Sequence, residues 1–552
     1  MATKILIQNL LQAKFILIIC TCFLLFQNTT AKALSLNHNE LKVSFDTDIT
    51  YGISMRTEDA DHDNLGAYGN RHFDDAGDIF SNVIRGSSTL AVDYKTMGLL
   101  VRGNYFYDYQ YDQVKLASDA KDKLVSEFML TDAFVYGYFG DEEQVNIRLG
   151  KQVISWGENT FIGGSINDIN TVDVNQLRQP GLALKDAFIG TQAAYISWNI
   201  NEEWMLESFY LFDFDPIELD PAGAFFATLD GAGKGGGFDH AGDGVLDAAC
   251  VSPDGISCGL GTLYRAADKF AKGAQYGVAL RRFFPEFLGG SEFGIYYQNL
   301  HDHVPMLSSF YGTNQFFLDY VEDIERFGLS FTANISDWAI SGEYSLRKDA
   351  PIQMTAPILN ASGFDVGSCT LGGCVFGQEI RGYETVDRHQ IQMTFYRIWG
   401  VSQFWGADDS STILEAAYGW VDNLPSNEAL DPILTGPVKT IFASQVSDNF
   451  WGFQVQHSLV YYAAFFNVVN ASPFIAFRYD VDGVSNEISP LFLEDRKALT
   501  LGVNFSYGSE TITGGISWTM FDGSNAMLNE GGGRLNDSTD RDFVQANISY
   551  SF

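Results

Sequence analysis

Charged and amide side chains recur at every second position of several segments of this sequence. Between Leu99 and Tyr111, for example, apolar residues and Gly hold the odd positions, while Arg102 and Asp108 lie at even ones. If such positions face a water-filled lumen, opposed charges would set a transverse field that selects solutes. The alternative is that these residues only pair for stability. Since the sequence does not show which rows face each other, both interpretations stay open. The candidate lumen lining comprises Arg85, Arg102, Asp108, Arg148, Arg281, Glu343, Arg347, Arg388, Gln390 and Gln454.

A second candidate site lies in the stretch 156–189, which shows no strand alternation. Gly and Pro break it into turns, yet it is rich in Ile, Val and Leu. Apolar side chains are costly to leave in water. We therefore expect this loop either to fold inward as a constriction or partial plug, or to pack on the rim of a barrel. The candidate constriction residues are Trp156, Glu158, Asn167, Asp168, Asp173 and Arg178.

Other motifs do not support catalysis or cofactor binding. The string 231–236 fits G-x-G-x-x-G but lacks the strand and helix that phosphate binding needs. The acidic run 59–70 begins like a calcium loop, but has Asn where the loop requires Gly and Glu. His389 and His457 have no Ser or Asp partner visible in the sequence. We predict no enzyme activity, no cofactor and no metal site.

The composition limits the class of protein that positions these residues. The chain has 552 residues, with 69 Asp+Glu against 34 Lys+Arg and a net charge of -35. This acidity excludes nucleic acid as a partner, because phosphate binding needs a basic face. Hydrophobic residues make up 46% and aromatic residues 14%, which excludes a disordered acidic chain. A mean hydropathy of -0.04 is too polar for a bundle of membrane helices. Together with 54 Gly, these values favour an outer-membrane β-barrel.

The N-terminus predicts export. Lys4 and Lys14 precede the apolar run 15–26, and Ala31-Lys32-Ala33 fits a cleavage site, so residues 1–33 are interpreted as a signal peptide. Four cysteines remain after cleavage, as two close pairs in Gly-rich stretches. In an oxidising periplasm we expect two local disulfides, with a zinc site as the less favoured alternative. These cysteines are Cys250, Cys258, Cys369 and Cys374.

The mature chain, 34–552, reads as a transmembrane antiparallel all-β barrel of about 16–18 strands. Eighteen period-2 segments of about ten residues are separated by tight turns and long loops in strict alternation. Short periplasmic turns and long extracellular loops are typical of outer-membrane barrels. Two of the longest outer loops are 215–272 and 348–385. The segments are expected to start near residues 41, 83, 99, 126, 144, 190, 203, 273, 291, 325, 338, 386, 411, 449, 472, 496, 510 and 542.

Two segments test the barrel interpretation. The last residues, 543–552, alternate apolar and polar side chains and end at Phe552, as in strands that the barrel assembly machinery binds. The stretch 459–477 carries no charge and is a transmembrane helix candidate by hydropathy alone. Because Asn, Ser and Pro interrupt its centre and right half, we interpret it as strand, turn, strand.

One family resemblance is specific. The strings R-L-G-K-Q-V-I-S-W-G-E at 148–158, I-N-x-I-N-x-V-D-V at 166–174 and L-R-Q-P-G at 177–181 resemble the proteobacterial family called domain of unknown function 1302. The resemblance covers nearly the whole mature chain and is strongest from 80 to 221. It implies an outer-membrane barrel of undefined substrate. It also implies association with a periplasmic or lipoprotein partner and an inner-membrane exporter of the resistance-nodulation-division type. It provides no site residues to carry over.

The leading hypothesis is a passive outer-membrane channel for small to medium solutes, lipophilic ones included, or the outer conduit of an envelope transport system. Its surroundings would be membrane lipid and lipopolysaccharide. Three alternatives stay open: a hydrophobic-substrate channel with a plug and lateral exit, a barrel enzyme of lipase or protease type, and an adhesion or docking barrel. Cargo, transport direction and oligomeric state do not follow from the sequence.

Overall fold

The computed structural model describes residues 34–61, 68–182, 186–227, 233–236, 264–310, 313, 315–353, 375–424, 428–430, 437–439, 446–487, 490–508, 510–523 and 538–552. The predicted signal peptide, 1–33, lies outside the described residues. So do Cys250, Cys258, Cys369 and Cys374, and much of the loops 215–272 and 348–385.

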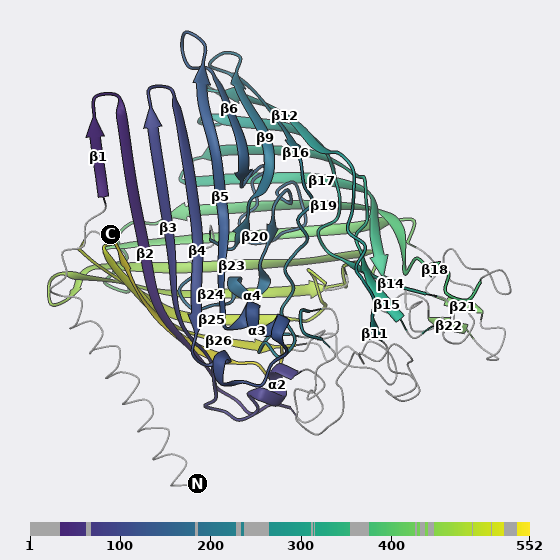
Figure 1. The fold of residues 1–552 in the computed structure, drawn as a ribbon. Coiled ribbons are helices and arrows are strands. Elements are labelled where there is room, and N and C mark those ends of the chain that lie inside the picture. Colours follow the sequence, from purple (N-terminus) through teal and green to yellow (C-terminus); the bar gives the residue numbers. More distant parts are fainter. Residues whose placement is uncertain are drawn as a thin grey trace, which may run out of the picture.

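Eighteen strands of the described chain form one antiparallel sheet that closes on itself (Figure 1). Each strand pairs with the next one in the sequence, and β27 pairs with β2 to complete the ring. The strands are β2 (Leu41–Arg56), β3 (Ile79–Tyr94), β4 (Met97–Asp108), β5 (Ser126–Phe139), β6 (Val145–Gln152), β9 (Thr191–Asn199), β10 (Trp204–Leu211), β12 (Gln275–Phe284), β13 (Ser291–Leu300), β16 (Ile324–Ile335), β17 (Trp338–Gln353), β19 (Tyr383–Ile398), β20 (Asp409–Asp422), β23 (Asn449–Phe465), β24 (Val469–Asp482), β25 (Lys497–Tyr507), β26 (Ile512–Asp522) and β27 (Phe543–Ser551). The predicted all-β barrel is therefore confirmed.

Burial along the strands is the inverse of that in a soluble protein. On β16, Phe327 and Leu329 are 39% and 51% exposed, whereas Arg326 and Ser330 on the opposite face are buried. Successive side chains of a strand point to opposite faces of the sheet. The apolar row therefore covers the outer wall of the barrel, and the charged row points inside.

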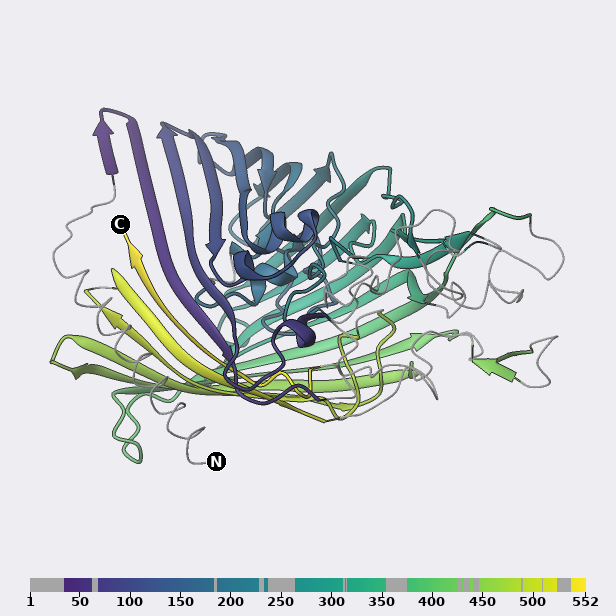
Figure 2. The same ribbon diagram turned by 60° about the horizontal axis from the view of Figure 1, so that its bottom comes forward.

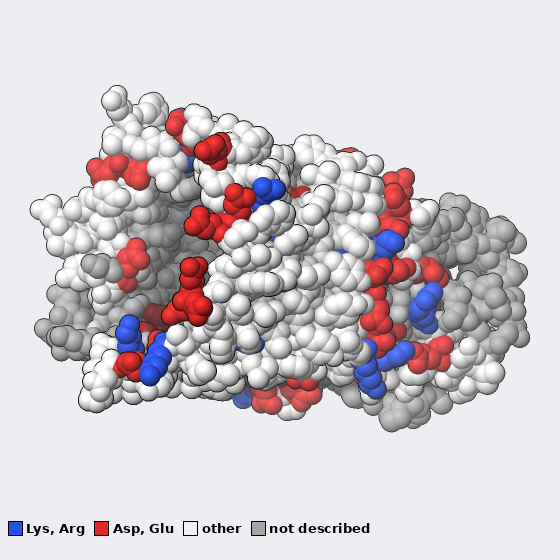
Figure 3. Space-filling model, turned by 90° about the horizontal axis from the view of Figure 1, so that it is seen from above, with Lys and Arg blue, Asp and Glu red and all other residues white. Residues whose placement is uncertain are grey.

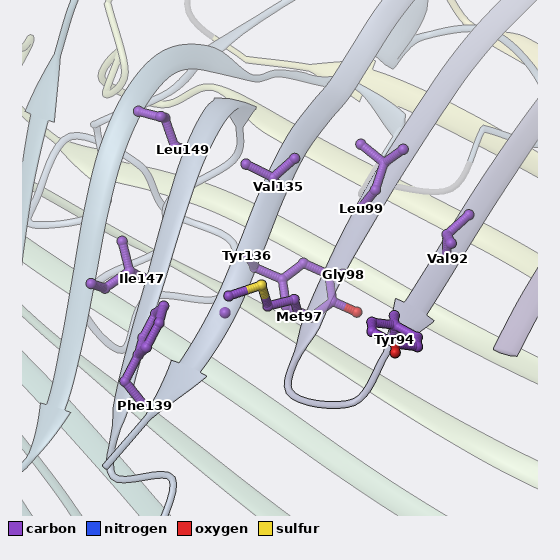
Figure 4. Close-up of a pocket in the computed structure, with 11 residues that line it drawn as sticks. Val92, Tyr94, Met97, Gly98, Leu99, Val135, Tyr136, Phe139, Ile147 and Leu149 are labelled. Atoms are coloured by element: carbon purple, nitrogen blue, oxygen red, sulfur yellow. The ribbon is translucent and has the colours of Figure 1, made fainter. Parts of the chain in front are cut away.

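One face of the outer wall carries few charges across its middle. Figure 3 shows a broad uncharged band with Asp, Glu, Lys and Arg gathered along its two borders. A shallow groove of about 490 Å³ crosses β3 to β6 on this wall, and its lining includes Leu99, Val135, Ile147 and Leu149 (Figure 4). Val135, Ile147 and Leu149 are 42–52% exposed. The wall thus presents apolar surface of the kind that lipid chains cover.

The connections between strands alternate strictly between short and long. The short ones are 95–96, 140–144, 200–203, 285–290, 336–337, 399–408, 466–468 and 508–511, all at one end of the barrel. Several place a residue other than glycine at positive φ, such as Lys95 and Ser336. The long ones, from 57–78 to 523–542, join strand ends at the other end of the barrel. The longer connections therefore all leave the strands on one side of the ring.

The uncharged stretch 459–477 is strand, turn, strand, and the helix alternative was wrong. β23 ends at Phe465 and β24 begins at Val469. Phe466 and Asn467 have φ values of 55° and 59°. Positive φ at both central residues is the geometry that joins twisted antiparallel strands most tightly. Among the described residues, none of the helices is long and apolar enough to cross a membrane.

Smaller elements occupy the long-loop end and the inside of the ring (Figures 1 and 2). A four-stranded sheet joins β11 (Tyr264–Arg265), β14 (Met306–Phe310), β15 (Gln315–Asp319) and β18 (Glu379–Ile380), and β21 (Glu428–Leu430) pairs with β22 (Pro437–Lys439). The helical segments are α2 (Tyr68–His72), η3 (Tyr111–Gln113), α3 (Ser118–Leu124) and α4 (Val174–Leu177), and β7 (Thr171–Val172) pairs with β8 (Phe188–Ile189). At the short-turn end, β1 (Leu34–His38) pairs with residues 41–45 of β2.

Candidate functional site

Residues 153–190, which connect β6 to β9, contact opposite sides of the ring and are called the inward loop below. Its first half reaches inward-facing side chains of β13, β16, β17, β19 and β20. Pro180 and Gly181 lie against Gly52 and Thr50 of β2 and Asn547 of β27. In Figures 1 and 2 the blue segment that includes α4 lies within the ring of strands. The loop therefore crosses the interior of the barrel.

Two buried carboxylates of the wall hold the first half of the loop. Glu415 accepts hydrogen bonds from the backbone N–H groups of Thr160, Phe161 and Ile162, at N–O distances of 2.9, 2.5 and 2.9 Å. Glu343 accepts from the backbone N–H of Glu158 at 2.6 Å. Hydrogen bonds to an ionised acceptor are about twice as strong as neutral ones. Side chains of the wall thus bind the backbone of the loop. Such contacts depend little on which side chains the loop carries.

Glutamine side chains of the wall donate hydrogen bonds to backbone carbonyl groups of the loop. Gln390 donates to the carbonyl oxygen of Gly163 at 3.0 Å, and Gln298 donates to that of Ile166 at 3.1 Å. Both glutamines are 1% exposed. A buried amide without a partner is costly, so these contacts also satisfy the polar wall.

Asp168 joins the loop to two arginines of the wall. Its carboxylate oxygen Oδ2 lies 2.7 Å from Nη1 of Arg326 and 2.5 Å from Nη2 of Arg347. Burial alone would raise the pKa of Asp168, but the guanidinium groups of Arg347 and Arg326 outweigh burial and hold this pKa well below its usual range. Asp168 therefore stays ionised at neutral pH.

Apolar side chains anchor the same half of the loop. Trp156 is 1% exposed and packs against Phe209 and Tyr296, with ring centroids 4.7 and 5.9 Å away. Ile162 packs in a second cluster that contains Phe450 and Phe492. Such burial explains why a loop so rich in apolar residues is stable inside a polar barrel.

The second half of the loop forms α4 and contacts the outer loops. Asp173 precedes the helix, and its Oδ1 accepts from the backbone N–H of Gln176 at 2.9 Å, which satisfies one of the free donors of the first turn. Arg178 forms an ion pair with Asp220 and lies 4.9 Å from the ring centroid of Phe226. Asn167 is partly exposed.

Two acidic groups of the loop titrate near neutrality. Burial raises the pKa of Glu158 to about 7, and the carboxylates of Glu292 and Glu343 add to the rise, while Arg281 opposes it. Burial also raises the pKa of Asp173 to about 7, although the hydrogen bond from Gln176 opposes this. The loop therefore changes its charge within the physiological pH range.

The remaining predicted lining residues fall into two groups. Arg102 forms an ion pair with Asp132 at 3.4 Å, Arg281 forms one with Glu207 at 3.0 Å, and Arg148 lies over the ring of Tyr195. These three, and Gln454, are partly exposed inside the barrel.

The second group is buried. Arg85 lies close enough to Asp186 and Asp173 of the inward loop to interact with their charges. Asp108 accepts hydrogen bonds from Ser81 and from backbone N–H groups, including that of Tyr111, and is 1% exposed. Asp108 therefore acts as a structural group at the end of β4. Glu343, Arg347, Arg388 and Gln390 belong to this buried group as well, because the inward loop and the loop that carries Glu487 cover them.

Glu415 and Arg326 are two of the site residues that are absent from the predicted lining. Glu415 lies on the same strand face as Ala417 and Gly419, so it is an isolated charge on an inward face of small residues. Arg326 alternates with Phe327 and Leu329. The period-2 pattern assigns both to the lumen face, and that pattern was the available signal. Within the described residues, no group of three or more His, Cys, Asp or Glu side chains is arranged to hold a metal ion.

This geometry holds a loop across the interior of a barrel and places several guanidinium and carboxylate groups beside it. Several solved barrels are similar in outline. Pseudomonas aeruginosa OpdK with vanillate matches with a TM-score of 0.42 at 9% identity, over 92% of this chain and 98% of that chain. Acinetobacter baumannii OccAB4 matches with a TM-score of 0.43 at 9% identity, over 92% of this chain and 98% of that chain. A BenF-like porin from Pseudomonas fluorescens Pf-5 matches with a TM-score of 0.44 at 8% identity, over 93% of this chain and 98% of that chain.

No curated protein matches the sequence. A family model does match, and it spans residues 14–552. The resemblance seen in the loop strings at 148–181 therefore extends across the whole barrel. The chain belongs to the family described as protein of unknown function DUF1302.

Proposed function

We propose that this protein is a passive outer-membrane channel for small to medium solutes, with a lumen narrowed by the inward loop. The observation that carries the proposal is the hydrogen bonding of Glu343 and Glu415 to the backbone of residues 158–166, which fixes a loop across a closed ring of strands. A ring of this size leaves room for an aqueous passage unless loops fill it.

The outer wall supports placement in a membrane. An open sheet edge is untenable in hydrocarbon, and closure of β27 on β2 removes it. The uncharged band of the outer wall matches the lipid-facing band of such barrels. By the usual orientation, the short turns and both ends of the chain face the periplasm, and the long acidic loops face lipopolysaccharide. The partners proposed with this orientation are the barrel assembly machinery, a periplasmic or lipoprotein partner and an inner-membrane exporter.

The charged inner wall favours an aqueous channel over a hydrophobic-substrate channel. Arg102, Arg148 and Arg281 are partly exposed inside the barrel, where a path for lipophilic cargo would require apolar residues. The arginines are paired or stacked, so the passage presents charge without a single dominant sign.

Conductance of the purified protein in planar bilayers tests the proposal. A matched variant replaces residues 153–190 with Asn-Gly, because Gln152 and Thr191 are directly paired and a two-residue turn can join them. We expect a small conductance from the native protein and a several-fold larger one from the variant. Absence of conductance from both proteins, with heat-modifiable gel migration retained, would overturn the channel assignment.

A barrel hydrolase is the competing assignment from another class. It requires a nucleophile or a metal-activated water beside a base. We expect no turnover of phospholipid or peptide substrates by the purified barrel in detergent. Turnover that persists through repeated chromatography and disappears in an inward-loop variant would replace the channel with an enzyme.

A further inference from the structure

Three arginines lie side by side across neighbouring strands of the inner wall. Arg326 of β16 is directly opposite Arg347 of β17, and Arg347 is directly opposite Arg388 of β19. Their exposures are 3%, 7% and 2%. Like charges placed opposite each other destabilise a sheet, and a buried charge must be paired. We call these three residues the arginine row.

The acids that pair with the arginine row come from loops. Asp168 of the inward loop bridges Arg326 and Arg347, and Glu487 of the loop between β24 and β25 forms an ion pair with Arg388. Asp302, which follows β13, acts on all three guanidinium groups by charge. The counter-ions therefore belong to segments that can move without breaking the ring of strands.

The arginine row has donors to spare. Nε and Nη2 of Arg326, and Nε of Arg347 and of Arg388, are buried and make no hydrogen bond. Asp168 uses a single oxygen, Oδ2, for both of its arginines. A guanidinium group can donate two parallel bonds to a carboxylate. Arg326 and Arg347 therefore offer more donors than Asp168 takes up.

The inward loop approaches the third arginine closely at Gly164. A Cβ atom at this position would lie 3.1 and 3.2 Å from the two terminal nitrogens of Arg388. Any larger residue would press on the guanidinium group. The loop thus covers the row from Asp168 to Gly164 and occupies the place from which a solute would reach it.

We propose that the arginine row is a binding site for small carboxylate solutes, in which Asp168 acts as a tethered competitor that an incoming carboxylate displaces. The proposal deepens the channel function and rests on it, because it names the class of solute that would reach the row through the lumen. Because Asp168 remains ionised at neutral pH, it leaves the arginines by exchange with another carboxylate and not by becoming protonated.

Chemical rescue tests the site without any measurement of transport. Asp168→Ala removes the resident carboxylate and should lower the melting temperature of the detergent-solubilised protein. Formate or acetate should then restore part of the loss, while chloride at the same ionic strength should not. Equal effects of formate, acetate and chloride would overturn the proposal.

Two further variants keep the test decisive. Asp220→Ala removes the partner of Arg178, which is 39% exposed, and formate should not rescue it. In Asp168→Ala/Arg347→Gln, the formate concentration for half-maximal rescue should rise at least tenfold; an unchanged value would place the rescue elsewhere. If Asp168→Ala fails to fold, Asp168→Ser, which also leaves room for a carboxylate beside the arginines, takes its place in the same comparison, with the same outcomes for or against the site.

The outcomes separate this site from the channel function. Specific rescue by formate without conductance in bilayers would keep the binding site and reject the channel. Conductance of the native protein without carboxylate-specific rescue would keep the channel and reject the site. In a conducting protein, Asp168→Asn should also shift the reversal potential in a salt gradient toward anion selectivity.

Discussion

At the scale of single residues, the inward loop depends most on Glu415. Three consecutive backbone N–H groups converge on this one carboxylate, and Thr394 donates to it from the neighbouring strand at 3.3 Å. Glu415 is fully buried. The donors of the loop satisfy both of its carboxylate oxygens, so loop and wall are mutually dependent.

We predict that Glu415→Gln loosens the loop while the ring of strands persists. The amide would point an N–H group at N–H donors, and loss of bonds to a charged acceptor should cost about 2 kcal/mol. Thermal melting should show reduced stability, and limited proteolysis should cut within 156–166. Glu142→Gln, an exposed change in a short turn, is the control and should leave both measurements unchanged. Protease resistance equal to that of the native protein would contradict this role.

The pKa of Glu158, about 7, predicts a pH dependence of stability. The folded protein holds this proton up to higher pH than an unfolded chain with the ordinary value of 4.5. Between these two values the folded state binds more protons, so stability falls as pH rises. The melting temperature should therefore drop between pH 5 and pH 8. In Glu158→Gln the drop should be smaller, with the remainder due in part to Asp173. Identical pH profiles would show that Glu158 does not titrate in this range.

The sequence supports the inward assignment of most site residues but not their partners. Arg347 and Glu343 were assigned to the inner face by alternation. Their contacts with Asp168 and the backbone of Glu158 span well over a hundred positions, and only the closed ring brings these residues together. The disulfide prediction for Cys250 and Cys258 stays a prediction, because both residues lie outside the described parts of the chain.

At the scale of elements, the strands were the most predictable part of the chain. The eighteen expected starts lie within four residues of those observed. The prediction works because each strand carries apolar side chains on its outer face and polar side chains on its inner face. The hairpin of β14 and β15 lies between the segments expected to start near residues 291 and 325, where no further strand is expected. Its strands are five residues long and buried on both faces, so no alternation marks them. β1 was missed because it pairs only along the end of β2.

The close contact between the inward loop and β2 depends on Gly52. A Cβ atom there would lie 2.6 Å from Cγ of Pro180 and 2.9 Å from its carbonyl oxygen. Gly52→Ala should therefore displace the loop and cost about 1–3 kcal/mol, the usual penalty of overpacking. Gly163→Ala is the matched control, because a Cβ at Gly163 meets nothing within 4 Å. A melting temperature for Gly52→Ala no lower than that of the control would show that Pro180 does not pack against Gly52.

At the scale of the whole molecule, the two ends of the barrel differ in what they contribute. The short turns fix the register of neighbouring strands. The long loops supply the residues that cross or cover the interior, including Asp168, Glu487 and Phe225. Phe225 stacks on Phe80 with ring centroids 3.9 Å apart, in a cluster at the long-loop end. The ring is thus a rigid frame, and its function is expected to vary through the loops of one end.

Closure of the ring is the physical requirement for all of these arrangements. Residues 48–56 of β2 pair with 543–551 of β27, and Thr47 exchanges two backbone hydrogen bonds with Phe552. Deletion of 543–552 would expose an unpaired strand edge, which costs several kcal/mol for each backbone group left in lipid. The truncated protein should lose the faster migration of unboiled samples in SDS gels. Replacement of 34–38 with a Gly-Ser segment is the control: it removes β1, which pairs with 41–45 outside the closure, and should leave migration heat-modifiable. A truncated protein that still migrates faster without boiling would show that the barrel does not depend on the β2–β27 pairing.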